Sequence, residues 1–151
     1  MTDVIFDLGG TLFNYRVAAV AIEDGRVLLS NEGRDNFWTL PGGRVKVGEP
    51  TAESLRRELL EELGTDARVG TLLWVVENFF SFRDETFHEL LFCWSVQLPE
   101  LTGLTGVDNP RVQYAWHPVN ALSTLNLHPR FLHEALTRPP STPAHIVQHD
   151  G

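Results

Sequence analysis

The spacing of hydrophobic and polar positions changes several times along this chain, and each change predicts a different element. Runs rich in apolar, β-branched and aromatic residues are typical of strands, and they occur at residues 4–6, 11–22, 26–30, 68–80, 86–98 and 112–118. Gly9-Gly10 and Asp24-Gly25 predict tight turns. We expect the hairpin across Asp24-Gly25 to be central, and the polar stretch 81–85 to join two long antiparallel strands.

Residues 51–63 have the spacing of a helix instead. Leu55, Leu59 and Leu63 recur every four residues, which places them on one side of a helix. Pro50 suits the first helical turn and Gly64 suits a left-handed cap at the end. The pattern predicts a helix of about 13 residues, roughly 20 Å long.

The same helix carries a stripe of carboxylates. Glu58, Glu61 and Glu62 lie three and four positions apart and share about a quarter of the helix circumference. Such a run is commonly a solvated face with ion pairs, and a pair between Arg57 and Glu61 fits that interpretation. Alternatively, carboxylates that repel one another invite a divalent cation, an interpretation favoured by the glycines and Glu49 just upstream.

The stretch from Gly43 to Thr65 resembles the Nudix box, G-x5-E-x7-R-E-U-x-E-E-x-G-U, in which U is a bulky aliphatic residue. The residues that fill this pattern in register are Gly43, Glu49, Arg57, Glu58, Leu59, Glu61, Glu62 and Gly64. Thr65 departs at the last aliphatic position, where we expect local repacking rather than lost chemistry. The resemblance implies an α/β (α+β) fold: a sandwich around a mixed sheet, with the box helix on one side and a closing helix over 129–136 on the other.

The resemblance also implies hydrolysis of a nucleoside diphosphate linked to another group, assisted by Mg²⁺ or Mn²⁺. Glu58 and Glu62 would be the main metal ligands. Glu61 would share a metal or a metal-bound water, and the carbonyl of Gly42 would add an oxygen. These are hard ligands suited to hard cations.

Glu49 and Arg57 would orient this cluster. The general base stays open between Glu61 and a carboxylate outside the box. Glu89, and after it Glu77, are the candidates, because charges embedded in apolar strands are costly unless they reach water, a partner or a metal.

Candidate substrate-binding residues come from the predicted strands. Arg16 is expected either at the surface or holding a terminal phosphate. Phe79 and Phe80 could stack on a base, with a place in the core as the alternative. For Trp38, the alternative to stacking is packing under the box helix, and the loop over 99–110 could lie across a substrate pocket.

The range of expected substrates is narrowed because residues typical of two groups of hydrolases in this family are absent. Ser81 stands where ADP-ribose hydrolases of this family have a proline, and Phe82 and Arg83 stand where dinucleoside polyphosphate hydrolases favour a tyrosine. The remaining candidate substrates are a nucleoside triphosphate or a broad range of small molecules.

Three other interpretations compete with this one. A catalytically silent Nudix-fold nucleotide sensor would usually have lost carboxylates. Isopentenyl diphosphate isomerases share the fold but need a cysteine near the glycine turn, whereas Cys93 lies far along the chain. Residues 7–11 resemble the first motif of haloacid dehalogenase-like phosphatases, but Gly9 replaces the second aspartate.

Composition limits the partners. The 151 residues suggest one domain over 1–138 with an N-terminal β-hairpin, followed by a proline-rich tail over 139–151. We expect the tail to form an ordered edge at most, or to pack on a second copy in a homodimer.

A formal charge of −8 argues against binding a nucleic-acid polymer. The single cysteine, and the lack of a secretory signal or membrane span, lead us to expect a cytoplasmic protein with no membrane contact.

Overall fold

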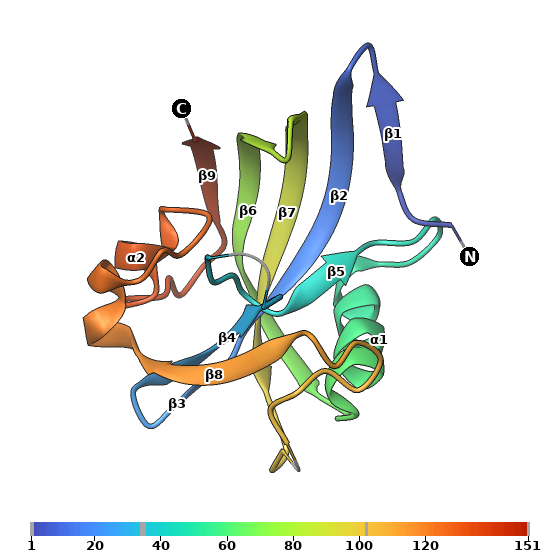
Figure 1. Cartoon of the computed structure of the whole chain (residues 1–151). Helices are drawn as coiled ribbons and strands as arrows, with labels where there is room; N and C mark the ends of the chain where they lie inside the picture. Colours follow the sequence, from blue (N-terminus) through green and yellow to red (C-terminus); the bar gives the residue numbers. More distant parts are fainter. Residues whose placement is uncertain (1, 34–35, 102, 151) are drawn as a thin grey trace.

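The computed structural model describes residues 2–33, 36–101 and 103–150. Its elements, in chain order, are β1 (Ile5–Leu8), β2 (Thr11–Val20), β3 (Ile22–Glu23), β4 (Arg26–Asn31), β5 (Gly42–Arg44), α1 (Thr51–Leu63), β6 (Arg68–Phe82), β7 (Glu85–Gln97), β8 (Gln113–Pro118), η1 (Val119–Thr124), α2 (Leu132–Ala135) and β9 (Ala144–His149). The expected strands and the box helix are all present (Figure 1).

The strands form two sheets. The larger sheet has the order β1-β2-β7-β6-β9, with β5 paired to β2, and the smaller one has the order β3-β4-β8. The β2·β7 and β6·β9 pairs are parallel and the other pairs are antiparallel, so the large sheet is mixed, as expected. The hairpin across Asp24-Gly25, which was expected to be central, joins β3 to β4 in the smaller sheet, where β4 lies between β3 and β8. Val27, Leu28 and Leu29 of β4 are fully buried, so this hairpin contributes to the core although it lies outside the large sheet.

The box helix begins and ends where its local signals predict. Pro50 precedes the first helical residue, and Gly64 adopts a left-handed φ of 66° while its N–H bonds to the carbonyl of Leu60. Leu55 and Leu59 are fully buried beneath the helix. The helix is therefore attached to the sheet by its apolar side, which leaves the other side for charged residues.

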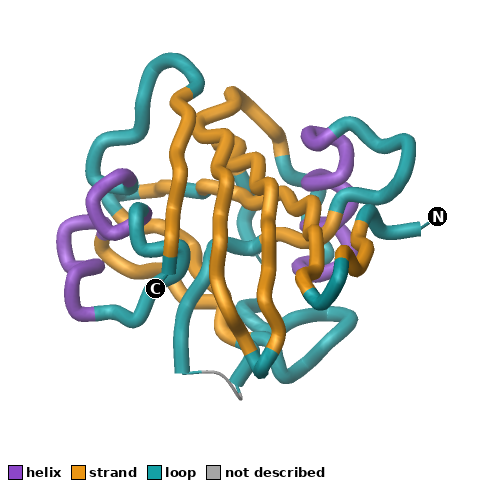
Figure 2. Tube along the Cα trace, turned by 90° about the horizontal axis from the view of Figure 1, so that it is seen from above, coloured by secondary structure: helices purple, strands orange, loops and turns teal. Residues whose placement is uncertain are grey.

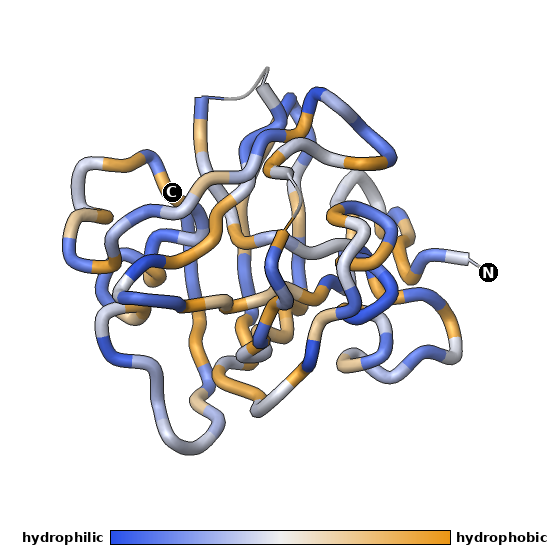
Figure 3. The backbone as a smooth tube through the Cα atoms, turned by 90° about the horizontal axis from the view of Figure 1, so that it is seen from below, coloured by the Kyte–Doolittle hydropathy of each residue, from blue (hydrophilic) through white to orange (hydrophobic). Residues whose placement is uncertain are grey.

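The two helical layers cover opposite faces of the large sheet. Val17 shares a core with Leu59 of α1, whereas its neighbour Ala18 shares another core with Leu132 of α2. Since successive strand residues point to opposite faces, α1 and α2 lie on different sides of the sheet. Figure 2 shows the helices at two opposite sides of the strands, and Figure 3 shows hydrophobic residues recurring along the chain in the middle of the molecule. The expected sandwich is confirmed.

The closing helix is shorter than expected. Residues 129–136 were predicted to be helical, but α2 covers only Leu132–Ala135, and the residues before it form turns closed by bonds such as Leu132 N–H to Pro129 O. Beyond it, β9 pairs with β6 from Trp74↔Ala144 to Phe79↔His149 and forms an edge of the large sheet.

No helix among the described residues is long and apolar enough to cross a membrane.

The loop between β7 and β8 lies against the box helix. The N–H of Val107 donates to the carbonyl of Glu62 at 2.7 Å. A free carbonyl at the end of α1 attracts this contact, because the last turn of a helix has unsatisfied acceptors. The loop therefore covers the C-terminal end of α1. That this loop could lie across a substrate pocket stays a prediction.

Candidate active site

Arg57 holds the carboxylates around α1 in a fixed arrangement. Its guanidinium makes a two-pronged contact with Glu49, with Nε–Oε2 and Nη2–Oε1 distances of 2.7 and 3.0 Å. Its Nη1 donates to Glu58 and Glu61, both at 3.2 Å. The hydrogen bonds from Arg57 lower the pKa of Glu49, and those to Glu49 raise the pKa of Arg57. These are the contacts that an orienting role requires, and that role stays a prediction.

The two glycines of the preceding turn allow close approach on two sides. A Cβ on Gly42 would lie 2.0 Å from the backbone oxygen of Val17 in β2. A Cβ on Gly43 would lie 2.3 Å from the carboxyl carbon of Glu58. Strand β5 can therefore reach both β2 and α1 only because neither residue has a side chain, and the Glu58 carboxylate rests against the backbone of Gly43.

Glu62 is partly buried and lies close enough to Glu58 to be affected by its charge. Burial, followed by the charge of Glu58, raises the pKa of Glu62 well above its usual range. The hydroxyl of Tyr114 donates to Oε2 of Glu62 at 3.3 Å and opposes this rise. Burial also raises the pKa of Glu58, while Arg57 lowers it. Two partly buried carboxylates without enough positive charge between them favour a proton or a cation.

The oxygen donors here suit a hard cation. Among the described residues, no group of three or more His, Cys, Asp or Glu side chains is arranged to hold a metal ion by itself. Mg²⁺ commonly binds through one or two carboxylates together with water and substrate phosphates. Glu58 and Glu62 on one stripe of α1, with the Gly42 carbonyl in β5, fit that mode rather than a complete protein cage.

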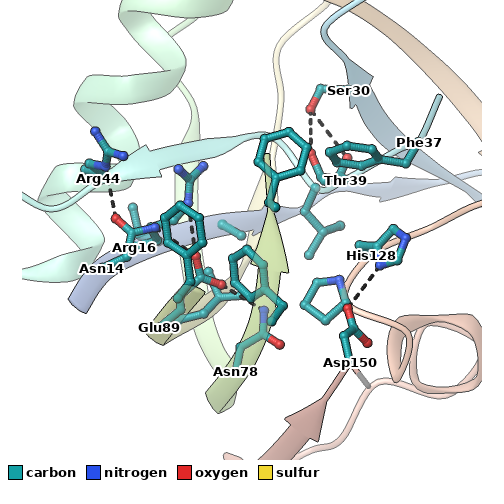
Figure 4. A pocket seen from close by; sticks show the side chains of 18 of the residues that line it. Asn14, Arg16, Ser30, Phe37, Thr39, Arg44, Asn78, Glu89, His128 and Asp150 are labelled. Carbon is teal, nitrogen blue, oxygen red and sulfur yellow. Dashed lines mark hydrogen bonds and ion pairs between the residues drawn. The ribbon is translucent and has the colours of Figure 1, made fainter. Parts of the chain in front are cut away.

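A pocket of about 480 Å³ opens on the face of the large sheet opposite α1 (Figure 4). Its lining includes Arg16 and Arg44 at the end nearest β5, and Phe37 farther along. Phe82 also lines the pocket. Arg16 also lowers the pKa of both Glu58 and Glu62, so it links the pocket electrostatically to the carboxylates of α1. Arg16 therefore lies at the pocket, with its side chain 36% exposed, and its role in holding a phosphate stays a prediction.

Glu89 lies at the floor of this pocket and is 6% exposed. Its two oxygens accept from the amides of Asn14 and Asn78, each at 3.0 Å, and Arg16 Nε lies 3.6 Å away. These partners offset the cost of burying the charge. Glu77 is directed elsewhere, because its carboxylate contacts the exposed His145 at 2.6 Å. Of the two embedded carboxylates, therefore, only Glu89 reaches the pocket.

The aromatic candidates divide between the two faces of β6. Phe80 lines the pocket and stacks on Phe87 with ring centroids 4.9 Å apart. Phe79 points to the opposite face, where its ring lies 4.7 Å from that of His88 and 4.8 Å from that of His149. The structure does not bring Phe79 into the pocket.

Trp38 and Cys93 also lie outside the pocket lining. Trp38 was expected either at a base or under the box helix, but its ring packs on His117 at 4.6 Å, beside the core that contains α2. Cys93 is fully buried in β7, and burial raises the pKa of its thiol. Neither residue faces the carboxylates of α1.

Several residues of the site were not selected from the sequence. Asn14 and Asn78 are polar residues inside apolar strands, which is the pattern that pointed to Glu89. They are buried, with exposures of 3% and 4%. Arg44 follows the glycine turn and donates to Asn14 Oδ1 at 2.9 Å. Tyr114 was placed only on a strand face, and no local pattern indicates Asp150, which lines the pocket from the end of the chain.

The family model described as NUDIX domain matches residues 13–137, and the chain therefore belongs to the Nudix family. It is 33% identical over 114 residues to the human 8-oxo-dGDP phosphatase NUDT18, covering 73% of this chain and 34% of that protein. It is 38% identical over 79 residues to an 8-oxo-dGTP diphosphatase of Proteus vulgaris, covering 52% and 69% respectively. A crystal structure of a NUDIX hydrolase from Nitrosomonas europaea has the same fold, with a TM-score of 0.66, 16% identity, and 91% and 79% of the two chains covered.

The chain matches only part of some relatives. It spans 34% of the human protein and 52% of another curated relative, the putative ADP-ribose pyrophosphatase YjhB of Bacillus subtilis. Family membership is shown by the match over residues 13–137.

Proposed function

We propose that this protein is a metal-dependent pyrophosphohydrolase that cleaves the diphosphate linkage of a nucleoside diphosphate joined to another group, such as a nucleoside triphosphate. One observation carries the proposal. Arg16 lines the pocket and influences the carboxylates of Glu58 and Glu62, so an anionic group placed at Arg16 would lie between the pocket and α1. The relatives' names, which refer to nucleotide phosphatases and diphosphatases, support the same class of substrate.

The pocket suits the nucleoside part of such a molecule. A volume of about 480 Å³ falls within the usual range for small-molecule sites. Phe37, Phe80 and Phe82 offer apolar walls, and Arg16 and Arg44 offer positive charge at the end toward β5. The phosphates would therefore point toward α1 and the base would point away from it.

The carboxylates would hold the cation that such a reaction needs. Mg²⁺ or Mn²⁺ at Glu58, Glu62 and the Gly42 carbonyl would neutralise phosphate charge and polarise the bond to be broken. Arg57 keeps Glu58 in place through its hydrogen bond at 3.2 Å. Arg57 engages only Oε2 of Glu61, whose side chain is 48% exposed, so Oε1 is available to accept a proton from the attacking water.

Glu89 is the weaker candidate for the base. Its two oxygens already accept from Asn14 and Asn78 at 3.0 Å, and it lies on the far face of the sheet from α1. We therefore assign proton removal to Glu61 and a binding role to Glu89.

The test is product analysis by chromatography over nucleoside triphosphates, nucleotide sugars, ADP-ribose and dinucleoside polyphosphates, with Mg²⁺ or Mn²⁺. Glu62→Gln should lower turnover by roughly a thousandfold or more, because it removes a principal ligand. It should also weaken Mn²⁺ binding measured by calorimetry with nucleotide present. Glu53→Gln on the same helix, outside the cluster, is the matched control and should change neither quantity.

Two outcomes would contradict the proposal. Metal-independent turnover that survives Glu62→Gln would mean that the carboxylates are not the reaction centre. Tight nucleotide binding without turnover of any member would favour the sensor alternative.

A further inference from the structure

Tyr114 reaches the box helix from the smaller sheet. It is the second residue of β8, it is 4% exposed, and it belongs to the core that contains Leu55 and Leu59 of α1. Its hydroxyl donates to Oε2 of Glu62 at 3.3 Å. The two residues are 52 positions apart in the chain, so this contact joins a strand outside the motif to one of the carboxylates of the motif.

The loop before β8 holds the backbone of the same glutamate. The N–H of Val107 donates to the carbonyl of Glu62 at 2.7 Å, and the loop lies beside α1 in Figure 1. The loop is tied to the strand that follows it, because the N–H of Tyr114 donates to the carbonyl of Leu104 at 2.8 Å. Glu62 is therefore held at its backbone and at its side chain by one segment, residues 104–114.

The contact engages one side of a partly buried carboxylate. Glu62 remains partly exposed, so a cation from the solvent can reach it. Tyr114 occupies Oε2, which leaves Oε1 to face a cation. Because the ring of Tyr114 is fixed by close packing, its hydroxyl restricts the positions that the carboxylate can adopt. The alternative is that the bond does no more than satisfy a buried hydroxyl group.

We propose that Tyr114 is a positioning residue for the cation site, and that its hydroxyl holds the Glu62 carboxylate in the orientation that binds Mg²⁺ or Mn²⁺. The inference rests on the proposed function, which makes Glu62 a ligand. Hydrogen bonds to ligating carboxylates fix their orientation, and loss of such a bond typically lowers metal affinity by roughly tenfold to hundredfold. A distance of 3.3 Å is long for an O–H···O bond, so we expect the lower end of this range.

Tyr114→Phe removes the hydroxyl and keeps the ring in the core, and the one other tyrosine of the chain supplies a matched control. Tyr15 in β2 packs against the same core, where its ring lies 5.8 Å from that of Phe92. Burial is the only influence on the pKa of the Tyr15 hydroxyl, so no carboxylate of the described residues lies against it. Tyr15→Phe therefore removes the same atom without touching Glu62.

The experiment measures the affinity of each variant for Mn²⁺ alone, by electron paramagnetic resonance of the free ion, together with the unfolding temperature. Tyr114→Phe should bind Mn²⁺ about tenfold more weakly than the wild type. It should melt within about 5 °C of the wild type, because it loses a single hydrogen bond. Tyr15→Phe should bind Mn²⁺ within about twofold of the wild type, because it leaves the hydrogen bond to Glu62 intact.

A double variant tests whether Tyr114 acts through Glu62. If it does, adding Tyr114→Phe to Glu62→Ala should lower Mn²⁺ affinity by less than about twofold beyond Glu62→Ala alone. In the assay of turnover, Tyr114→Phe should need about tenfold more Mn²⁺ for its half-maximal rate, while KM for the nucleotide changes by less than about twofold. A packing defect alone would not produce this separation between metal and nucleotide.

The outcomes separate this inference from the proposed function. Equal Mn²⁺ affinity in the wild type and Tyr114→Phe, or a loss of equal size in Tyr15→Phe, would overturn the positioning role while the hydrolase stands. An undiminished effect of Tyr114→Phe in the Glu62→Ala background would overturn it as well. If no nucleotide is turned over, the proposed function fails, and the Mn²⁺ affinities, which need no turnover, still decide the role of Tyr114.

Discussion

Adding one methyl group at Gly43 should separate catalysis from folding. In Gly43→Ala the new Cβ would lie 2.3 Å from the carboxyl carbon of Glu58 and 2.5 Å from both its oxygens. These atoms are the end of a flexible side chain, which can rotate away without moving the backbone. Gly42→Ala is the matched control for folding, because its Cβ would lie 2.0 Å from Val17 O and 2.9 Å from the Cα of Ala18, both in β2.

The expected losses of rate and stability depend on which atoms the new methyl group displaces. In Gly43→Ala the Glu58 carboxylate must retreat by about 1 Å to reach normal van der Waals separation. A displacement of this size at a reacting centre costs roughly a hundredfold in rate. In Gly42→Ala the paired strands β2 and β5 must separate, which should cost about 3 kcal/mol and lower Tm by roughly 10 °C for a chain of this length.

The assay pairs thermal unfolding with steady-state kinetics on whichever nucleotide the product analysis identifies as a substrate. We expect Gly43→Ala to melt within about 3 °C of the wild type while its kcat falls by about two orders of magnitude. Gly42→Ala should melt far lower. Full activity in Gly43→Ala would refute the reasoning, since Glu58 would then not need the position that the structure gives it. Equal loss of stability in both variants would refute it as well.

Three further results are expected. Leu59→Ala should destabilise the protein by about 2–5 kcal/mol because Leu59 is fully buried, whereas Leu60→Ala, at a residue 53% exposed, should cost less than about 1 kcal/mol in chemical denaturation. Arg57→Lys should lower kcat roughly tenfold or more with little change in KM, because lysine cannot reproduce the two-pronged contact with Glu49. An unchanged kcat would mean that this contact is not needed for catalysis. Removing divalent cations with a chelator should abolish turnover, and adding Mg²⁺ or Mn²⁺ should restore it, without a change in secondary structure by circular dichroism.

The box helix could be predicted residue by residue because its signals are local. Pro50 and Gly64 mark its two ends within one turn of the helix itself. The four-residue spacing of Leu55 and Leu59 fixes which side is buried. The contact between Arg57 and its acidic neighbours was likewise anticipated, since these groups share one helix and the short loop before it.

The pocket could be predicted only in part, because it depends on which strands pair and in what register. Asn14 and Glu89 meet because β2 and β7 pair in parallel over a separation of 75 residues. No local pattern encodes that register. Trp38 was placed beside the wrong helix for the same reason: its backbone pairs with Leu127, whose position depends on the whole C-terminal half. A one-residue shift in β6 would exchange Phe79 for Phe80 at the pocket.

Chemistry and selectivity therefore have different origins in this chain. The carboxylates that would hold a cation lie on one helix, within a short stretch of sequence. The residues that line the pocket lie largely on β2, β6, β7 and the segment after β9, and these elements reach the pocket through separate strand pairings. A relative can keep the motif and still present different side chains at the pocket. Substrate choice should thus be sought in the residues that line the pocket rather than in the motif that identifies the family.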